Sequence, residues 1–274
     1  MNESISLLFG EEKIDSFALL PFSVCRVTRP YLYEKEGLVP QSAILFLMPY
    51  YTLTPENFSA YAAPRDYHLY IKALGKRLLA RLEALYPKHR FFIFADHSPI
   101  DERHAAVLGG LGVFGKNGLL LSEKYGSYQF IGEILSDAPP SLLGEVTLFP
   151  LRSCLDCGAC RRACPTGILG GSGTECLSAI TQKKGELSEE EKALMRRENT
   201  AWGCDACQSV CPYNLRAKEA GTLITPIPFF KEKLIARFDS EMLAALDESA
   251  FAERAFSWRG RAVAQRNAKI LEED

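Results

Sequence analysis

The chain has 274 residues, of which 47% are hydrophobic, and its 32 Lys and Arg nearly balance 34 Asp and Glu. The formal net charge of -2 excludes proteins that gather nucleic acid or anionic lipid through a global basic field. The length suffices for two modest hydrophobic cores. The N-terminus lacks the basic start and long apolar core of a signal peptide, and no later apolar run reaches about 18 residues. We therefore expect a soluble, cytoplasmic monomer that has no membrane partner.

Residues 1–140 show the alternation of strands and helices that is typical of an α/β sheet domain. Short apolar runs bounded by Pro, Asp or charged residues predict buried strands. These strands are expected at residues 43–48, 91–95, 119–121 and 128–135. Apolar residues at helical spacing predict a helix over residues 67–86, and a glycine-rich turn follows at residues 109–118.

The second half of the chain divides further. The paired prolines Pro139 and Pro140 do not suit the interior of a regular element and mark a domain edge. A cysteine-rich domain then covers residues 141–225, and the Ser-x-x-Glu pattern that begins at Ser188 predicts a capped helix inside it. A helical C-terminal segment is expected over residues 226–274.

Eight of the nine cysteines fall within residues 154–211, and this clustering points to metal rather than to disulfides. The run from Cys154 has the bacterial ferredoxin spacing Cys-x2-Cys-x2-Cys-x3-Cys-Pro, in which three thiolates bind one cubane and the fourth binds its neighbour. The run from Cys204 repeats this ending without its opening cysteine, and Cys176 is the available replacement. The count then predicts two 4Fe-4S clusters, one held by Cys154, Cys157, Cys160 and Cys211, and the other by Cys164, Cys176, Cys204 and Cys207.

Zinc is the main alternative, because C-x2-C pairs also suit a tetrahedral zinc site. The Cys-Pro endings favour clusters, since zinc has no need of a fourth cysteine and a proline at each end. The expected fold class is therefore an N-terminal α/β (or α+β) sheet domain, then a bacterial-ferredoxin-like double 4Fe-4S domain and a helical tail. Cys25 stands apart and is expected to be a buried structural thiol.

One candidate for proton chemistry lies at the end of the strand predicted over residues 91–95. Asp96 and His97 follow it directly, and the carboxyl ends of strands are where α/β sheets gather ligands. A carboxyl group there is expected to be partly desolvated, which would raise the pKa of Asp96 and suit it to proton donation. The alternative is that Asp96 caps the turn at residues 98–100.

The glycine-rich stretch resembles a phosphate-binding motif but does not match it fully. The stretch 110–117 nearly spells a P-loop, but Asn117 stands where a hydroxyl residue would bind magnesium. The residues before it, 104–108, also suggest a helix rather than the strand that a P-loop requires. We expect no nucleotide site here.

Several stretches together are similar to the epoxyqueuosine reductase family. The resemblance covers roughly residues 61–270, and the combination is far more specific than any one motif. The matching stretches are Asp96–Arg103, Gly110–Asn117, Gly126–Ile134, Cys176–Thr181 and Gly203–Asn214, with Arg65–His68 and Arg266–Ala268 in addition.

The resemblance implies a cobalamin-dependent oxidoreductase. In the family, cobalamin lies between an α/β domain and the double-cluster domain, the clusters reduce its cobalt, and an aspartate matching Asp96 donates a proton as the epoxide of a tRNA nucleoside is removed. No Asp-x-His-x-x-Gly cobalamin motif is present, and family members bind cobalamin without one. The candidates for lining the cobalamin, by their place in the matching motifs, are Asp96, Arg103, Lys116, Leu120, Ile131 and Ser178.

The resemblance predicts a short form that lacks the C-terminal helical repeats, which help to hold tRNA. Residues before about 60 also match poorly, and the net charge agrees with a weaker grip on tRNA. The expected partners are an external electron donor and tRNA. Two alternatives stay open: a ferredoxin-like electron-transfer protein without its own substrate, and a corrinoid-dependent reductase of another substrate.

Overall fold

The computed structural model describes residues 3–273, which divide into two compact units. The first, here called the sheet unit, runs to Pro49 and resumes over His68–Leu155. The second, the cysteine unit, contains Tyr50–Tyr67 and the chain from Asp156 onward. Neither unit is one continuous stretch, because residues 50–67 group with the cysteine unit. The expected division at residues 140 and 225 stays a prediction.

The sheet unit is built on a four-stranded antiparallel sheet of order β1-β2-β6-β3. A separate two-stranded sheet pairs β4 with β5. The four strands expected from apolar runs are all present, and the mixed α/β fold class is confirmed. The strands are β1 (Phe17–Pro21), β2 (Ser42–Pro49), β3 (Phe91–Phe94), β4 (Val113–Phe114), β5 (Leu120–Leu121) and β6 (Gln129–Ser136).

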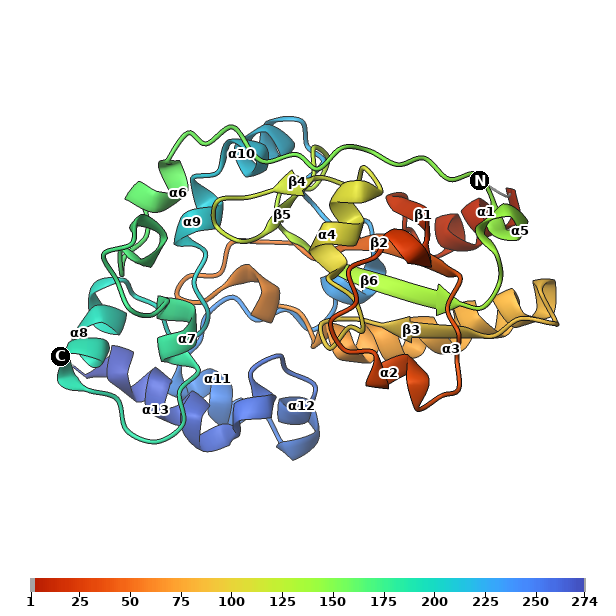
Figure 1. Ribbon diagram of the computed structural model, residues 1–274. Helices are drawn as coiled ribbons and strands as arrows, with labels where there is room; N and C mark the ends of the chain where they lie inside the picture. Colours follow the sequence, from red (N-terminus) through yellow and green to blue (C-terminus); the bar gives the residue numbers. More distant parts are fainter. Residues whose placement is uncertain (1–2, 274) are drawn as a thin grey trace. The chain divides into compact units, whose positions relative to one another are not determined.

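Helices cover both faces of the four-stranded sheet (Figure 1). On one face α3 (Tyr67–Leu85) lies so close to β3 that a Cβ on Gly75 would come within 2.7 Å of Ile93. Phe9 of α1 (Glu3–Glu11) packs on Phe46 of β2, with ring centroids 5.3 Å apart. Both central strands are therefore buried on two sides, which is why their sequences are nearly continuous apolar runs.

The opposite face carries α4 (Glu102–Leu108). Its buried residues form one hydrophobic cluster with side chains from β2 and β6, and this cluster includes Ala105, Ala106, Val107, Leu45, Ile131 and Leu135. The N-cap of α4 is Asp101, whose side chain accepts a hydrogen bond from the amide of His104 at 3.1 Å. The remaining short helices of this unit are η1 (Phe22–Val24), α2 (Tyr31–Glu34) and α5 (Pro140–Leu143).

The cysteine unit consists of short helices around a core centred on the fully buried Trp202. The expected capping box is confirmed at α8, where the Ser188 hydroxyl accepts from the Glu191 amide and the Glu191 carboxylate accepts from the Ser188 amide. Among the described residues, none of the helices has the length and apolar character needed to cross a membrane. The elements are η2 (Ala60–Ala62), α6 (Ala159–Arg162), η3 (Ile168–Gly170), α7 (Leu177–Thr181), α8 (Glu189–Arg197), α9 (Ala206–Ser209), α10 (Pro212–Glu219), η4 (Pro228–Lys231), α11 (Ser240–Ala245), α12 (Glu248–Ala252), η5 (Ser257–Arg259) and α13 (Arg261–Glu272).

Buried polar side chains join distant segments of the cysteine unit. Asn267 of α13 is fully buried and donates from its side-chain amide to the carbonyls of Thr181 at 2.6 Å and Ala201 at 2.8 Å. The Asp205 carboxylate accepts from the backbone amide of Ala60 at 2.8 Å and also from the Ser59 hydroxyl. These bonds fix the chain on both sides of the cysteines that follow residue 203.

Candidate functional site

Seven of the eight predicted cluster ligands lie in the cysteine unit, and Cys154 lies near the end of the sheet unit. Each run of cysteines alternates tight turns with short helices. In the first run Asp156 and Gly158 have positive φ values of 49° and 72°, which reverse the chain before α6 begins. Cys176 is the N-cap residue of α7, and Cys211 is the N-cap residue of α10.

The fold brings the thiols of the cysteine unit together in two groups. Burial raises the pKa of the Cys211 thiol, and the nearby Cys157 and Cys160 raise it further. Burial likewise raises the pKa of Cys204 to about 11, and Cys176 and Cys164 add to that rise. Cys211, Cys157 and Cys160 all belong to one predicted ligand set, and Cys204, Cys176 and Cys164 all belong to the other. The ligand sets themselves stay a prediction.

Backbone amides point at several of these sulfur atoms, among them those of Cys211 and Cys164. Amides of Tyr213 and Asn214, at the start of α10, hydrogen-bond to Cys211 and act against the effect of burial on its pKa. Burial alone would raise the pKa of Cys164, but amides of the following turn, together with the Thr166 hydroxyl, bring it below its ordinary value. Thiolates are the form that binds metal, and hydrogen bonds to sulfur tune a cluster's potential. Pro212 follows Cys211 at the start of α10, where the backbone amide that proline lacks would have no partner within the helix.

Within the described residues, no three His, Cys, Asp or Glu side chains converge as ligands of one metal ion. A cubane makes a different demand, because each of its four irons takes a single thiolate. Cys154 is held from within the sheet unit, where its amide donates to the Phe114 carbonyl at 2.8 Å.

Asp96 lies on an exposed loop directly after β3. Its φ of 62° is in the left-handed region, which is uncommon for residues other than glycine and is found at functional sites. The expectation that Asp96 is partly buried is wrong, because β3 is an edge strand of an antiparallel sheet and its end opens to solvent. The N-cap of α4 is Asp101, so Asp96 does not cap that helix, and its role in the turn at residues 98–100 stays a prediction. His97 is exposed, and its Nε2 lies 2.9 Å from the Tyr31 hydroxyl.

The desolvated carboxyl groups lie beneath this loop, and sequence reasoning missed both. Burial raises the pKa of Glu133, on β6, to about 8, and the charge of Glu102 adds to the rise. Burial also raises the pKa of Glu102, on α4, to about 7, with a further contribution from Asp96. The signal in the sequence was a glutamate inside the apolar run that forms β6.

Five of the six candidates for lining cobalamin lie in the sheet unit, and Ser178 lies in the cysteine unit. Leu120 and Ile131 are nearly buried side chains of the cluster beneath α4. The exposed Arg103 donates to the carbonyl of Gly118 at 2.5 Å, in the turn that follows Lys116. Ser178 accepts from the side chain of Gln182 at 3.2 Å.

The side chains of the sheet unit fit the chemistry of cobalamin. A corrin has an apolar ring with hydrogen-bonding amide groups at its rim, and Leu120 and Ile131 supply apolar surface. Next to Lys116, the side-chain Nδ2 of Asn117 is buried without a hydrogen-bond partner, although its Oδ1 accepts from the Leu119 amide at 3.3 Å. A buried donor without a partner is costly, and a rim amide would satisfy it.

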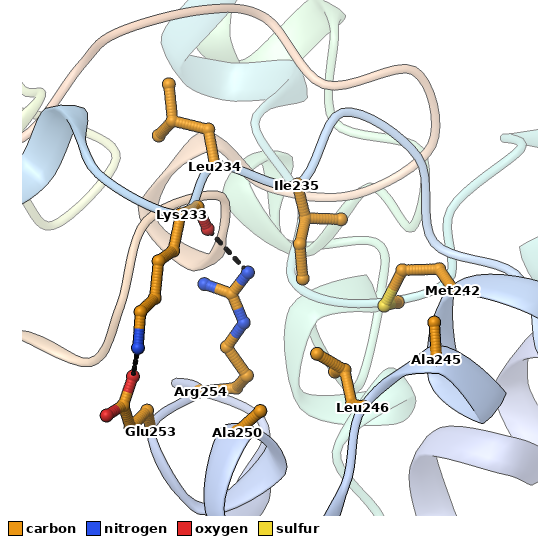
Figure 2. Close-up of a pocket in the computed structure, with 9 residues that line it drawn as sticks. All are labelled: Lys233, Leu234, Ile235, Met242, Ala245, Leu246, Ala250, Glu253 and Arg254. Carbon is orange, nitrogen blue, oxygen red and sulfur yellow. Dashed lines mark hydrogen bonds and ion pairs between the residues drawn. The ribbon is translucent and has the colours of Figure 1, made fainter.

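A cavity of about 330 Å³ lies in the cysteine unit between the segment at Lys233 and the helices α11 and α12 (Figure 2). The buried Arg254 donates to the Lys233 carbonyl at 2.6 Å, and the Lys233 side chain pairs with Glu253 at 2.8 Å. The predicted site residues are not part of its lining.

Residues 153–214 match the family of 4Fe-4S double cluster binding domains. This match confirms the prediction of two 4Fe-4S clusters. Over 191 residues, the chain is 35% identical to an epoxyqueuosine reductase from Leadbetterella byssophila, covering 66% of this chain and 61% of that protein. Another, from Pseudomonas aeruginosa, is 37% identical over 61% of this chain and 47% of its own length. The chain therefore covers less than two thirds of the length of these relatives.

The fold agrees with this relationship. The structure of epoxyqueuosine reductase from Streptococcus thermophilus matches 99% of this chain and 81% of its own, with a TM-score of 0.73 and 25% identity. Both the sequence and the fold thus make this chain a homologue of the epoxyqueuosine reductases, with a 4Fe-4S double cluster domain.

Proposed function

We propose that this chain is a cobalamin-dependent iron-sulfur reductase that converts epoxyqueuosine in tRNA to queuosine. The observation that carries the proposal is a double-cluster domain in one chain with an exposed aspartate loop, in a homologue of the epoxyqueuosine reductases. A solved relative of 23% identity, with a TM-score of 0.74, is described with an epoxyqueuosine-modified tRNA stem loop. That likeness concerns the fold, so the tRNA substrate is part of this proposal.

Removal of an epoxide oxygen as water leaves an alkene and consumes two electrons and two protons. The cysteine ligands would hold the clusters, which would supply one-electron transfer from an external donor. Cobalamin, when bound, would supply a reducible cobalt. Asp96 donates a proton to the oxygen as the carbon-oxygen bond breaks, and its exposed loop leaves the carboxyl group accessible to a substrate.

The remaining candidates bind and orient. Arg103 and Lys116 are exposed cations of the sheet unit, and both suit the polar rim of cobalamin or a phosphate of the substrate. Leu120 and Ile131 limit water on the apolar side. Ser178, next to the predicted ligand Cys176, provides a hydroxyl from the cysteine unit.

The test begins with anaerobic reconstitution of the full chain with iron, sulfide and cobalamin, followed by gel filtration and an absorbance spectrum. Cobalamin is expected to co-elute near one per chain with about eight irons, four for each cluster. The loaded protein is then given a chemical reductant and an epoxyqueuosine-modified anticodon stem loop, and the nucleosides are separated by mass spectrometry.

Formation of queuosine would support the proposal, and its dependence on salt would report phosphate contacts. A fully loaded protein that leaves both the stem loop and intact tRNA unchanged would overturn the substrate. Protein that binds irons but no cobalamin would overturn the reductase and favour the electron-transfer alternative.

A further inference from the structure

The register of the sheet places a carboxylic acid in the middle of an apolar surface. Glu133 of β6 is paired with Leu45 of β2 on one side and with Phe94 of β3 on the other. Directly opposed residues point to the same face of a sheet, and Leu45 belongs to the cluster that packs beneath α4. Glu133 therefore faces α4, and none of its surface is exposed.

A second carboxyl group faces the same place from the first turn of α4. The Oε2 atom of Glu102 is buried and has no hydrogen-bond partner, and the same is true of Oε1 of Glu133. Burial raises the pKa of both groups, and the charge of Glu102 adds to the rise at Glu133. A negative charge on both groups in this apolar region is unfavourable, so ionisation of Glu102 favours the protonated form of Glu133.

Both carboxyl groups are bonded to the Asp96 loop. The Glu102 carboxylate accepts a hydrogen bond from the backbone amide of Asp96. The Oε2 atom of Glu133 lies 2.6 Å from the hydroxyl of Ser98, which is itself buried. The loop is therefore held at two of its residues, 96 and 98, by the two members of one pair.

The Ser98 hydroxyl shows which protonation state this geometry suits. Its oxygen accepts from the Ile100 amide at 3.1 Å and lies 2.9 Å from the Ile100 carbonyl. A hydroxyl has one proton to donate, yet two acceptors lie within reach, the Ile100 carbonyl and Glu133. When Glu133 carries the proton it donates to Ser98, and Ser98 can donate to the carbonyl, so every contact is satisfied.

Other ionisable groups either act weakly on the two carboxyl groups or also favour their protonated forms. The half-buried thiol of Cys25 lies near Glu133, and burial followed by that carboxylate raises its pKa to about 12. Glu102 feels the positive charge of Arg103 and the negative charges of Asp96 and Asp101. Arg103 is exposed and bonded to the Gly118 carbonyl, so it is not a buried counter-charge for the two carboxyl groups.

We propose that Glu133 carries a proton at neutral pH and donates it to Ser98, while Glu102 accepts from the Asp96 amide. In that state the two carboxyl groups hold the Asp96 loop in its left-handed conformation, so that they are positioning residues for the proposed proton donor. The proposal rests on the proposed function of Asp96. Loss of the Glu133 proton would leave a charge on a fully buried carboxyl group, which favours release of the loop.

The first test needs no turnover. The reconstituted full chain, with glutamate labelled by carbon-13, is examined by infrared spectroscopy for the carbonyl band of a protonated carboxylic acid at neutral pH. The band is expected in the wild type and in Glu123→Gln, which changes an exposed glutamate of the same unit, and is expected to disappear in a Glu102→Gln, Glu133→Gln double variant. Absence of the band from the wild type would overturn the proton on Glu133.

The second test measures amide exchange in the peptide that contains residues 94–101. Glu133→Ala is expected to speed exchange at least about tenfold, the equivalent of about 1.4 kcal/mol, and Glu133→Gln, which mimics the neutral acid, is expected to restore most of the protection. The wild type should lose protection as pH rises, and Glu133→Gln should not. If Glu133→Gln exchanged as fast as Glu133→Ala, the charge rather than the proton would hold the loop, and the proposal would fail.

The donor role of Asp96 and the positioning role of the two glutamates can be contradicted separately. If the band and the exchange pattern are found but Asp96→Asn retains turnover, the loop is held as proposed and Asp96 is not the donor. If Asp96→Asn abolishes turnover while exchange is independent of Glu133, the donor stands and the positioning role is lost. In the supporting case, the alkaline limb of the pH profile of turnover shifts upward in Glu133→Gln.

Discussion

The carboxylate of Asp205 accepts a hydrogen bond from the backbone amide of Ala60 at 2.8 Å, although these residues are far apart in sequence. Asp205 lies between the predicted ligands Cys204 and Cys207, and the side chain of Gln208 also donates to it at 2.8 Å. Burial of a carboxyl group raises its pKa unless such donors compensate, and at Asp205 burial outweighs them. The bond therefore connects the second cysteine run to the segment at residues 50–67.

We expect Asp205→Ala to destabilise the cysteine unit by about 2 to 4 kcal/mol, because it removes a buried acceptor from several donors at once. Urea unfolding at equal cluster loading measures the change, and the iron content after reconstitution should also fall. Glu219→Ala, an exposed change in the same unit, is the control for a general effect of charge. Equal stability of wild type and Asp205→Ala would contradict the structural role of this bond.

The cluster assignment predicts what single cysteine variants do. Cys176→Ser removes one ligand of one cluster, so iron should fall from about eight per chain toward about four. Cys25→Ala should keep the full complement, because Cys25 is not among the ligands. The measurement is iron and acid-labile sulfide per chain, supported by electron paramagnetic resonance of the reduced protein. A complete pair of clusters in Cys176→Ser would remove Cys176 from the set.

The proton-donor role predicts a specific defect. Asp96→Asn should retain iron and cobalamin but lower turnover of the modified stem loop by about 10²-fold or more, as loss of a general acid does. Glu83→Gln, an exposed change on α3, is the control and should keep full turnover. Turnover of the Asn variant at the wild-type rate would reassign the donor.

The buried acids predict how stability depends on pH. Both carboxyl groups have a pKa raised from 4.5, that of Glu102 to about 7 and that of Glu133 to about 8. Between the ordinary value of 4.5 and these raised values, the native state binds more protons than the unfolded state. The stabilising contribution of the two groups is therefore present in acid and is lost as pH rises. The stability of wild type minus that of Glu133→Gln should therefore fall with pH, by about 2 kcal/mol or more at about 1.4 kcal/mol per pKa unit. A flat or rising difference in urea unfolding would refute the shift.

Close approach of two central strands predicts a steric effect. A Cβ on Gly132 would come within 2.3 Å of the ring of Phe46, which is fully buried. Gly132→Ala should cost about 1 to 3 kcal/mol of stability, and Phe46→Leu in the same chain should relieve part of that loss in a double-mutant cycle. Gly10→Ala is the matched control, since nothing lies near its Cβ position on α1, and it should be neutral or slightly stabilising.

The elements that were predictable from sequence are those whose signal is local. The strands β2 and β6 are apolar because both of their faces are covered, and the capping box of α8 lies within four residues. The two cysteine runs are equally local, because ligand spacing is a property of the loop itself. Their division into two ligand sets came from counting ligands and stays a prediction.

The exposure of Asp96 and the burial of Glu133 depend on information that no local pattern contains. Whether the end of β3 is covered depends on the strand order, which makes β3 an edge strand of an antiparallel sheet. Whether a residue of β6 faces α4 or α3 depends on the register of three strands. Strand order and register thus decided which carboxyl group is desolvated, and both arise only from the assembled sheet.

The route of the chain between its two units has a consequence for how the protein is made. Residues 57–59 bond to residues 201–202, which leave the ribosome much later, through the Asn57 carbonyl and the Ser59 amide at 2.7 Å each. Contacts of such separation slow folding, because a long loop must close before they form. Residues 50–67 therefore cannot form these bonds until residues 201–202 have been synthesised, whereas the sheet strands on either side of this segment are complete earlier. A shortened chain that ends at residue 155 would keep this segment and lose residues 201–202, so an expressed sheet unit needs residues 50–67 replaced by a short linker.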